Sequence, residues 1–114
     1  MEIINVAIKV RKYFETSSIP KNELASLYLK YNPLVKDIDN FIEQAFILFP
    51  ALNCGLATVY LLAKLQKGKP INGKYQSYPH TFLLLERDTI VDITADQFGG
   101  PRVYVGQLQS PWKL

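Results

Sequence analysis

The chain has 114 residues, of which 48% are hydrophobic, and these numbers suit one domain with its own core. The formal net charge of +3 comes from scattered lysines and arginines, and the one local cluster (Lys64, Lys67, Lys69 and Lys74) lacks the aromatic stacking residues of a nucleic-acid-binding module. We therefore expect no nucleic-acid partner. A single cysteine and a single histidine exclude a disulfide framework and a structural zinc site, so we expect no metal cofactor either.

The N-terminal stretch MEIINVAIKVRKYF differs from a signal peptide. Its second residue is acidic, basic residues interrupt its apolar positions, and no small-residue cleavage site follows. No part of the chain approaches the run of about 18 apolar residues that a membrane span needs. We therefore expect a cytoplasmic protein without a membrane partner, or a domain that acts in the cytoplasm of a target cell if it belongs to a larger exported chain.

The first half of the chain predicts three helices. Apolar residues recur at helical spacing over residues 2–15, which indicates an amphipathic helix. A second helix carries Pro20 at an early position and ends at Asn32-Pro33. A third is capped by Asp37 or Asp39 and is closed by the proline of the FP dipeptide that follows NFIEQAFIL. Residues 1–50 should therefore form a helical layer.

A fourth helix and a small sheet are predicted for residues 51–114. The helix begins at Asn53 or Cys54 and runs through LATVYLLAKLQK to Gly68, a suitable left-handed C-terminal cap, and its apolar face indicates a central, buried position. GKPINGKYQSYP reads as a loop, after which HTFLLLE, TIVDIT and RVYVG predict short strands. We expect an α+β domain over residues 1–114, with this helix packed on a three- or four-stranded antiparallel sheet.

The only cysteine, Cys54, falls in the first turn of the central helix. Unpaired backbone N–H groups and the helix macrodipole lower the pKa of a thiol in this position below its usual value of about 8.5. Asn53 has a side chain suited to capping, and Gly55 leaves room for a substrate carbonyl to reach backbone N–H groups that would hold an oxyanion. The alternative is an inert thiol, because free cysteine is among the most buried residue types.

Two further residues could complete a catalytic site. His80 opens the first strand and could deprotonate Cys54. Asp92 interrupts a β-branched run, where a carboxylate needs a partner. Asp96 is the competing carboxylate, but it follows the strand and could simply cap a turn.

Residue parity decides whether His80 and Asp92 can meet. If HTFLLL and TIVDIT form a hairpin, a two-residue turn pairs Leu83 with Asp92 and places His80 on the opposite face. A three-residue connection pairs Phe82 or Leu84 with Asp92, and His80 and Asp92 then share a face. In the Phe82 pairing the two residues are diagonal neighbours, about 7 Å apart at their Cα atoms. A catalytic triad therefore predicts an odd-length connection or a bulge.

The phrases NCGLATVYLL and HTFLLLERDTIVDITADQF resemble the papain-like cysteine-enzyme superfamily, most of all its transglutaminase-like and bacterial cell-wall-peptidase branches, over about residues 49–105. Small bacterial relatives include leader-peptide peptidases and toxins or effectors. The resemblance implies that Cys54 is the nucleophile, His80 the base and Asp92 the group that orients the imidazole. No glutamine shortly precedes Cys54 to serve an oxyanion hole, so the side chain of Asn53 or the backbone N–H of Cys54 would substitute.

These observations predict a thiol hydrolase or acyltransferase that acts on an amide bond, as a peptidase, amidase, deamidase or transglutaminase-type enzyme. Its partner would be a peptide or protein substrate, joined by an inhibitor or immunity protein if it is a toxin. Gln97 is expected to support the loop beneath Asp92. Trp112 is expected to cover the core or to line the cleft, and packing on the core is the favoured role. The alternative function is a non-catalytic interaction or regulatory module, which a Cys54 sulfur without accessible surface would favour.

Overall fold

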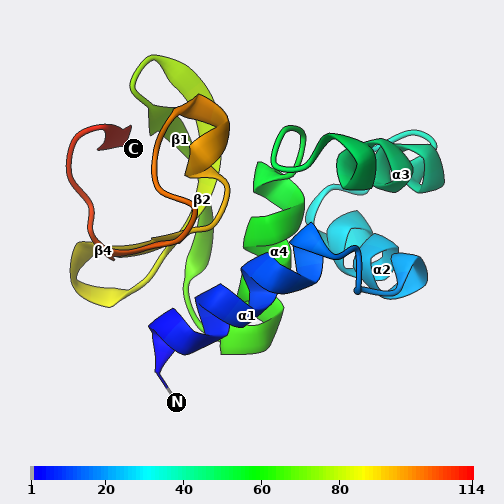
Figure 1. The fold of residues 1–114 in the computed structure, drawn as a ribbon, viewed down its shortest axis with the longest axis horizontal. Helices are drawn as coiled ribbons and strands as arrows, with labels where there is room; N and C mark the ends of the chain where they lie inside the picture. The colour runs from blue at the N-terminus through cyan, green and yellow to red at the C-terminus, as the bar shows by residue number, and fades with distance from the viewer. Residues whose placement is uncertain (1) are drawn as a thin grey trace.

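The computed structural model describes residues 2–114, and this part of the chain has the predicted α+β architecture (Figure 1). Its four α-helices are α1 (Ile3–Glu15), α2 (Lys21–Tyr31), α3 (Ile38–Leu48) and α4 (Cys54–Leu65). Its five strands are β1 (Lys69–Tyr75), β2 (Tyr78–Leu84), β3 (Thr89–Asp92), β4 (Tyr104–Gln107) and β5 (Trp112–Lys113). None of the helices within residues 2–114 has the length and apolar character needed to cross a membrane.

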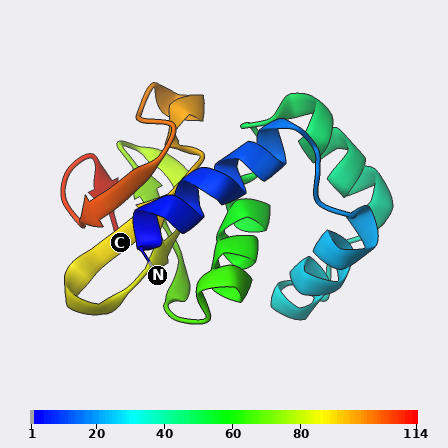
Figure 2. The same cartoon turned by 60° about the horizontal axis from the view of Figure 1, so that its bottom comes forward.

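Helix α4 occupies the centre of the fold, as its apolar sequence predicts. It lies between the sheet on one side and α2 on the other, and α1 crosses it (Figures 1 and 2). Leu56 and Leu61 of α4 are at most 1% exposed. The helix ends earlier than predicted, because Gln66 adopts the left-handed conformation that terminates it, with φ of 55°. Gly68, which also has a positive φ of 96°, lies in the connection to β1. Helix α3 is capped by Asp37, one of the two predicted cap residues, whose carboxylate accepts the Asn40 backbone N–H.

The sheet has the order β4-β3-β2-β1-β5, with every neighbouring pair antiparallel. Its apolar side chains pack on both faces. Leu83 of β2 belongs to the main core with the helices, whereas Phe82 belongs to a second cluster with Tyr75 and Trp112. Because side chains alternate along a strand, His80 lies on the Phe82 face.

The prediction of a loop at GKPINGKYQSYP was wrong, because these residues form β1 and the start of β2. Strand β5 covers only Lys74 and Tyr75 of β1, so Pro70 lies where β1 is an edge and needs no N–H. Gly73 has a packing role, because a Cβ there would lie 2.2 Å from the backbone oxygen of Lys113 in β5. Glycine and proline therefore meet specific requirements of this strand instead of breaking it.

Candidate active site

The hairpin of β2 and β3 brings His80 and Asp92 together. Leu83 pairs with Val91 and Leu84 with Ile90, a register that places Phe82 opposite Asp92. The backbone N–H of Leu85 donates to the oxygen of Thr89, so the connection consists of the three residues 86–88. The predicted odd-length connection is thereby confirmed, and Nε2 of His80 lies 2.7 Å from Oδ2 of Asp92 with both side chains at most 1% exposed.

Four donors surround the Asp92 carboxylate and fix its orientation. Oδ1 accepts the backbone N–H of Thr94 at 2.9 Å and the Thr94 hydroxyl at 3.4 Å. Oδ2 accepts the indole N–H of Trp112 at 2.8 Å in addition to Nε2 of His80. A buried carboxylate with this set of partners is fully satisfied and has little freedom to rotate.

The hydrogen bond from Trp112 to Asp92 was not predicted from the sequence, which favoured packing on the core over a place in the cleft for this residue. Trp112 is 5% exposed and follows Asp92 by 20 positions. It reaches the carboxylate because β5 pairs with β1, with Trp112 opposite Tyr75. That pairing depends on the unrecognised strand β1, so no local signal could have identified Trp112 as a partner of Asp92.

His80 lies among aromatic rings and is strongly basic. The rings of Tyr75 and Phe98 stand nearly perpendicular to the imidazole, with centroids 6.3 and 5.2 Å away. Burial lowers the pKa of His80, but interactions with Asp92 and Cys54 outweigh it and raise the pKa to about 9. Because Asp92 occupies Nε2, Nδ1 is the nitrogen left for Cys54. Nδ1 has no hydrogen bond of regular geometry among residues 2–114, as in many thiol–imidazole pairs without substrate.

The raised pKa of His80 predicts how stability depends on pH. The imidazole titrates near 6.5 in the unfolded chain and near 9 in the folded one, so the folded state binds more protons between these values. This contribution to stability should be complete below pH 6.5 and should be lost as the pH rises through 9. His80 is the only histidine, so its Cε1 proton can be followed by NMR without overlap. A folded-state midpoint near 6.5 would contradict the assignment.

Cys54 is the first residue of α4 and is partly exposed. Burial raises the pKa of its thiol, but the favourable interactions of the sulfur with His80 and with the backbone of Thr81 prevail, so the pKa lies below its usual value. The first helical hydrogen bond runs from the Ala57 N–H to the oxygen of Asn53. The N–H groups of Cys54, Gly55 and Leu56 therefore have no acceptor within the helix. This arrangement suits an anion beside the sulfur.

The side chain of Asn53 does not have the predicted capping role. It is fully buried, and Nδ2 donates to the backbone oxygens of Ala45 and Ala51 at 2.7 Å each. Both amide protons are thus used, so this side chain has none left for an oxyanion, and the backbone N–H of Cys54 is the remaining alternative. Asn53 instead supports the turn between α3 and α4. Its Oδ1 has no hydrogen-bond partner in the described chain.

Gly55 admits a side chain from α2 beside the start of α4. A Cβ at Gly55 would lie 3.2 Å from Cε1 of Tyr28 and 3.4 Å from the Tyr28 hydroxyl. The glycine therefore lets the Tyr28 ring approach the helix closely, in addition to the substrate access that the sequence predicts.

Gln97 and Asp96 lie in the short 3₁₀-helix η2 (Ala95–Phe98) that follows β3. Gln97 donates through Nε2 to the Thr94 oxygen at 3.1 Å, which agrees with the expected support of the loop after Asp92. Asp96 forms a bidentate pair with Arg11 of α1, at 2.7 and 2.8 Å, and has no bond to His80. Asp96 therefore acts in the fold, and Asp92 is the carboxylate of the site.

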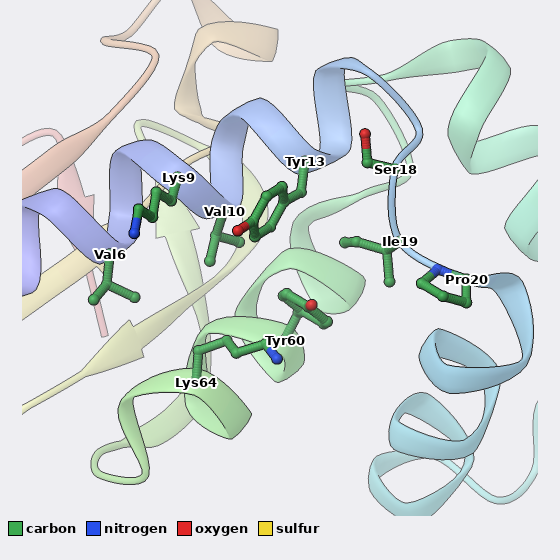
Figure 3. Close-up of a pocket in the computed structure, with 9 residues that line it drawn as sticks. All are labelled: Val6, Lys9, Val10, Tyr13, Ser18, Ile19, Pro20, Tyr60 and Lys64. Atoms are coloured by element: carbon green, nitrogen blue, oxygen red, sulfur yellow. The ribbon is translucent and has the colours of Figure 1, made fainter.

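A cavity of about 540 Å³ opens beside Cys54 and lies between α2, α3 and the β1–β2 hairpin. Its lining includes Tyr28, Tyr31, Phe41, Asn72 and Thr81. A second cavity, of about 360 Å³, separates α1 from α4, with Lys9 and Tyr13 facing Tyr60 and Lys64 (Figure 3). Cys54 lines the first cavity and not the second, so we assign the candidate site to the first.

Residues 2–114 contain no cluster of three or more histidine, cysteine, aspartate or glutamate side chains arranged to hold a metal ion. Comparison with known proteins gives no match to a family model, to a curated protein or to a solved structure. Inference about function therefore starts from the geometry of the site itself.

Proposed function

We propose that the protein is a cysteine-dependent hydrolase or acyltransferase that acts on an amide bond of a peptide or protein. The observation that carries the proposal is the buried 2.7 Å contact between His80 and Asp92, with the Cys54 thiol beside the same imidazole at the start of α4. The chain order of cysteine, histidine and aspartate also resembles that of the papain-like superfamily, which we propose as its relative.

Before substrate binds, Nδ1 of His80 already holds the proton of the Cys54 thiol, because the pKa of the imidazole is raised to about 9 and that of the thiol is lowered. The resulting thiolate attacks the amide carbonyl carbon, and the electron pair of the C=O bond moves to oxygen. The unpaired N–H groups at the start of α4 stabilise this oxyanion. Protonated Nδ1 gives its proton to the amine as the C–N bond breaks, which leaves a thioester on Cys54.

The thioester is resolved by water or by an amine. His80 removes a proton from the incoming nucleophile, which attacks the thioester carbonyl, and Cys54 leaves when the tetrahedral intermediate collapses. Asp92 accepts a hydrogen bond from the Nε2–H group throughout, without taking the proton, and so keeps Nδ1 directed at the sulfur. Water yields a carboxylic acid and an amine yields a new amide.

The proposal is tested by the rate of iodoacetamide alkylation against pH. Cys54 is the only cysteine, so the wild-type rate reports this thiol alone. We expect an inflection well below the usual value of about 8.5. In His80→Ala the inflection should move up toward that value. A slow wild-type reaction with an ordinary inflection, unchanged in His80→Ala, would contradict the proposal and favour an interaction module with an inert thiol.

A further inference from the structure

The cavity beside Cys54 has an aromatic wall made by two helices. The rings of Tyr28 and Tyr31 in α2 have centroids 5.9 Å apart, and the centroid of the Phe41 ring in α3 lies 5.3 Å from that of Tyr28. Leu52, which is 50% exposed, extends this wall toward the nucleophile. No aspartate, glutamate, lysine or arginine is among the lining residues. Such a wall favours a neutral, apolar group and disfavours a charged one, which would lose water without gaining a partner.

The opposite wall carries a hydrogen-bond donor whose orientation is fixed. Oδ1 of Asn72 accepts the Tyr31 hydroxyl at 3.1 Å and the Thr81 hydroxyl at 2.8 Å. Both hydroxyls act as donors in this arrangement and hold the amide oxygen on their side. The NH₂ group of Asn72 then points away from both hydroxyls, and its two protons have no protein partner in the described structure. It can donate to a carbonyl of a bound molecule.

We infer that this cavity binds the acyl side of the substrate, with an aromatic or large aliphatic side chain next to the carbonyl that Cys54 attacks. The side chain packs on Tyr28, Tyr31 and Phe41, and the NH₂ group of Asn72 holds the preceding backbone carbonyl. Cys54 and Gly55 line the same cavity, so a chain bound there presents its carbonyl to the sulfur. The inference rests on the proposed function and adds the substrate class: a neutral peptide with a bulky apolar residue on the acyl side of the amide.

Acetyl-aminoacyl chloromethyl ketones test this assignment. In these probes the thiolate displaces chloride, and the acetyl carbonyl occupies the position of the preceding backbone carbonyl. The phenylalanyl probe should inactivate Cys54 at least about 10-fold faster than the glycyl probe, with saturation, and the aspartyl probe should be slower than both. Phe41→Ala should remove most of the phenylalanyl preference. Tyr13→Ala, an aromatic truncation on α1 outside the cavity, should keep it.

Asn72→Asp provides a second test that preserves the local structure, because an aspartate oxygen can still accept the Tyr31 and Thr81 hydroxyls while the donor is lost. The phenylalanyl probe should react several-fold more slowly with this variant. Equal rates for the phenylalanyl and glycyl probes would overturn the inferred substrate class. If the iodoacetamide inflection is low at the same time, the proposed function survives alone; if the inflection is ordinary, both fail.

Discussion

Replacement of Asp92 by asparagine should slow the alkylation of Cys54 at pH 6.5 by up to about 100-fold, the ratio between a fully ionised thiol and one with the usual pKa of about 8.5. Without the carboxylate, burial dominates the pKa of His80 and lowers it, so the imidazole no longer stabilises a thiolate. Asparagine also matches the site poorly, because the Trp112 indole and both Thr94 donors require oxygen at both positions. One donor pair would face an NH₂ group in either orientation.

Asp96→Asn is the matched control for this experiment. It removes a charge four positions away and weakens the pair with Arg11, but it leaves every hydrogen bond of Asp92 in place. We expect a loss of stability with the low alkylation inflection retained. The roles assigned to the two carboxylates would be reversed if Asp92→Asn kept the low inflection and Asp96→Asn lost it.

Arg11→Met should destabilise the fold by about 1–3 kcal/mol, the cost of leaving a buried hydrogen-bonding group without its charged partner. Arg11 is 6% exposed, and its guanidinium donates to Asp96 twice, to Glu15 at 2.9 Å and to the backbone oxygen of Ile93 at 2.8 Å. It also lies over the Phe49 ring, 4.6 Å from the centroid. These contacts join α1 to the segment that follows β3, so their loss leaves the buried oxygen of Ile93 unpaired and the half-buried Asp96 without its cation.

Urea unfolding measures this effect, with Arg102→Met as the control. Arg102 also bonds to Glu15, but its side chain is 68% exposed, and solvent-exposed ion pairs contribute about 0–1 kcal/mol. The unfolding midpoint of Arg102→Met should therefore stay close to that of the wild type. Similar decreases in the free energy of unfolding of the two variants would show that the network around Arg11 stabilises the fold no more than an exposed ion pair does.

The parts of the fold that the sequence predicts are those that local patterns encode. Helix α4 is recognisable because its apolar residues cover the whole helix, and the pairing of His80 with Asp92 follows from strand parity once the connection is three residues long. Strand β1 is not recognisable in the sequence, because proline and glycine interrupt its apolar residues. Both residues are tolerated because β5 packs on Gly73 and leaves Pro70 at an edge, and the position of β5 depends on the tertiary structure.

Polar contacts between residues far apart in the chain are the other feature that the sequence does not predict. Arg11 and Asp96 are 85 positions apart, and Trp112 meets Asp92 through three strand pairings, β5 with β1, β1 with β2 and β2 with β3. A cationic side chain in an amphipathic helix normally faces water, so nothing near Arg11 in the sequence distinguishes a buried guanidinium from a solvated one. The two hydrogen bonds that Asn53 donates to the backbone of Ala45 and Ala51 were not predicted either, because an asparagine before a helix usually indicates a cap.

The hydrogen bond from Trp112 to Asp92 gives the molecule an intrinsic optical probe. Trp112 is the only tryptophan, so all indole fluorescence comes from the ring whose N–H donates to the Asp92 oxygen that also accepts from His80. Emission excited at the red edge of the absorption band would respond to the charge of the neighbouring imidazole and to a molecule bound at Cys54. Occupancy and protonation could then be followed in real time in the unlabelled protein, before any substrate is identified.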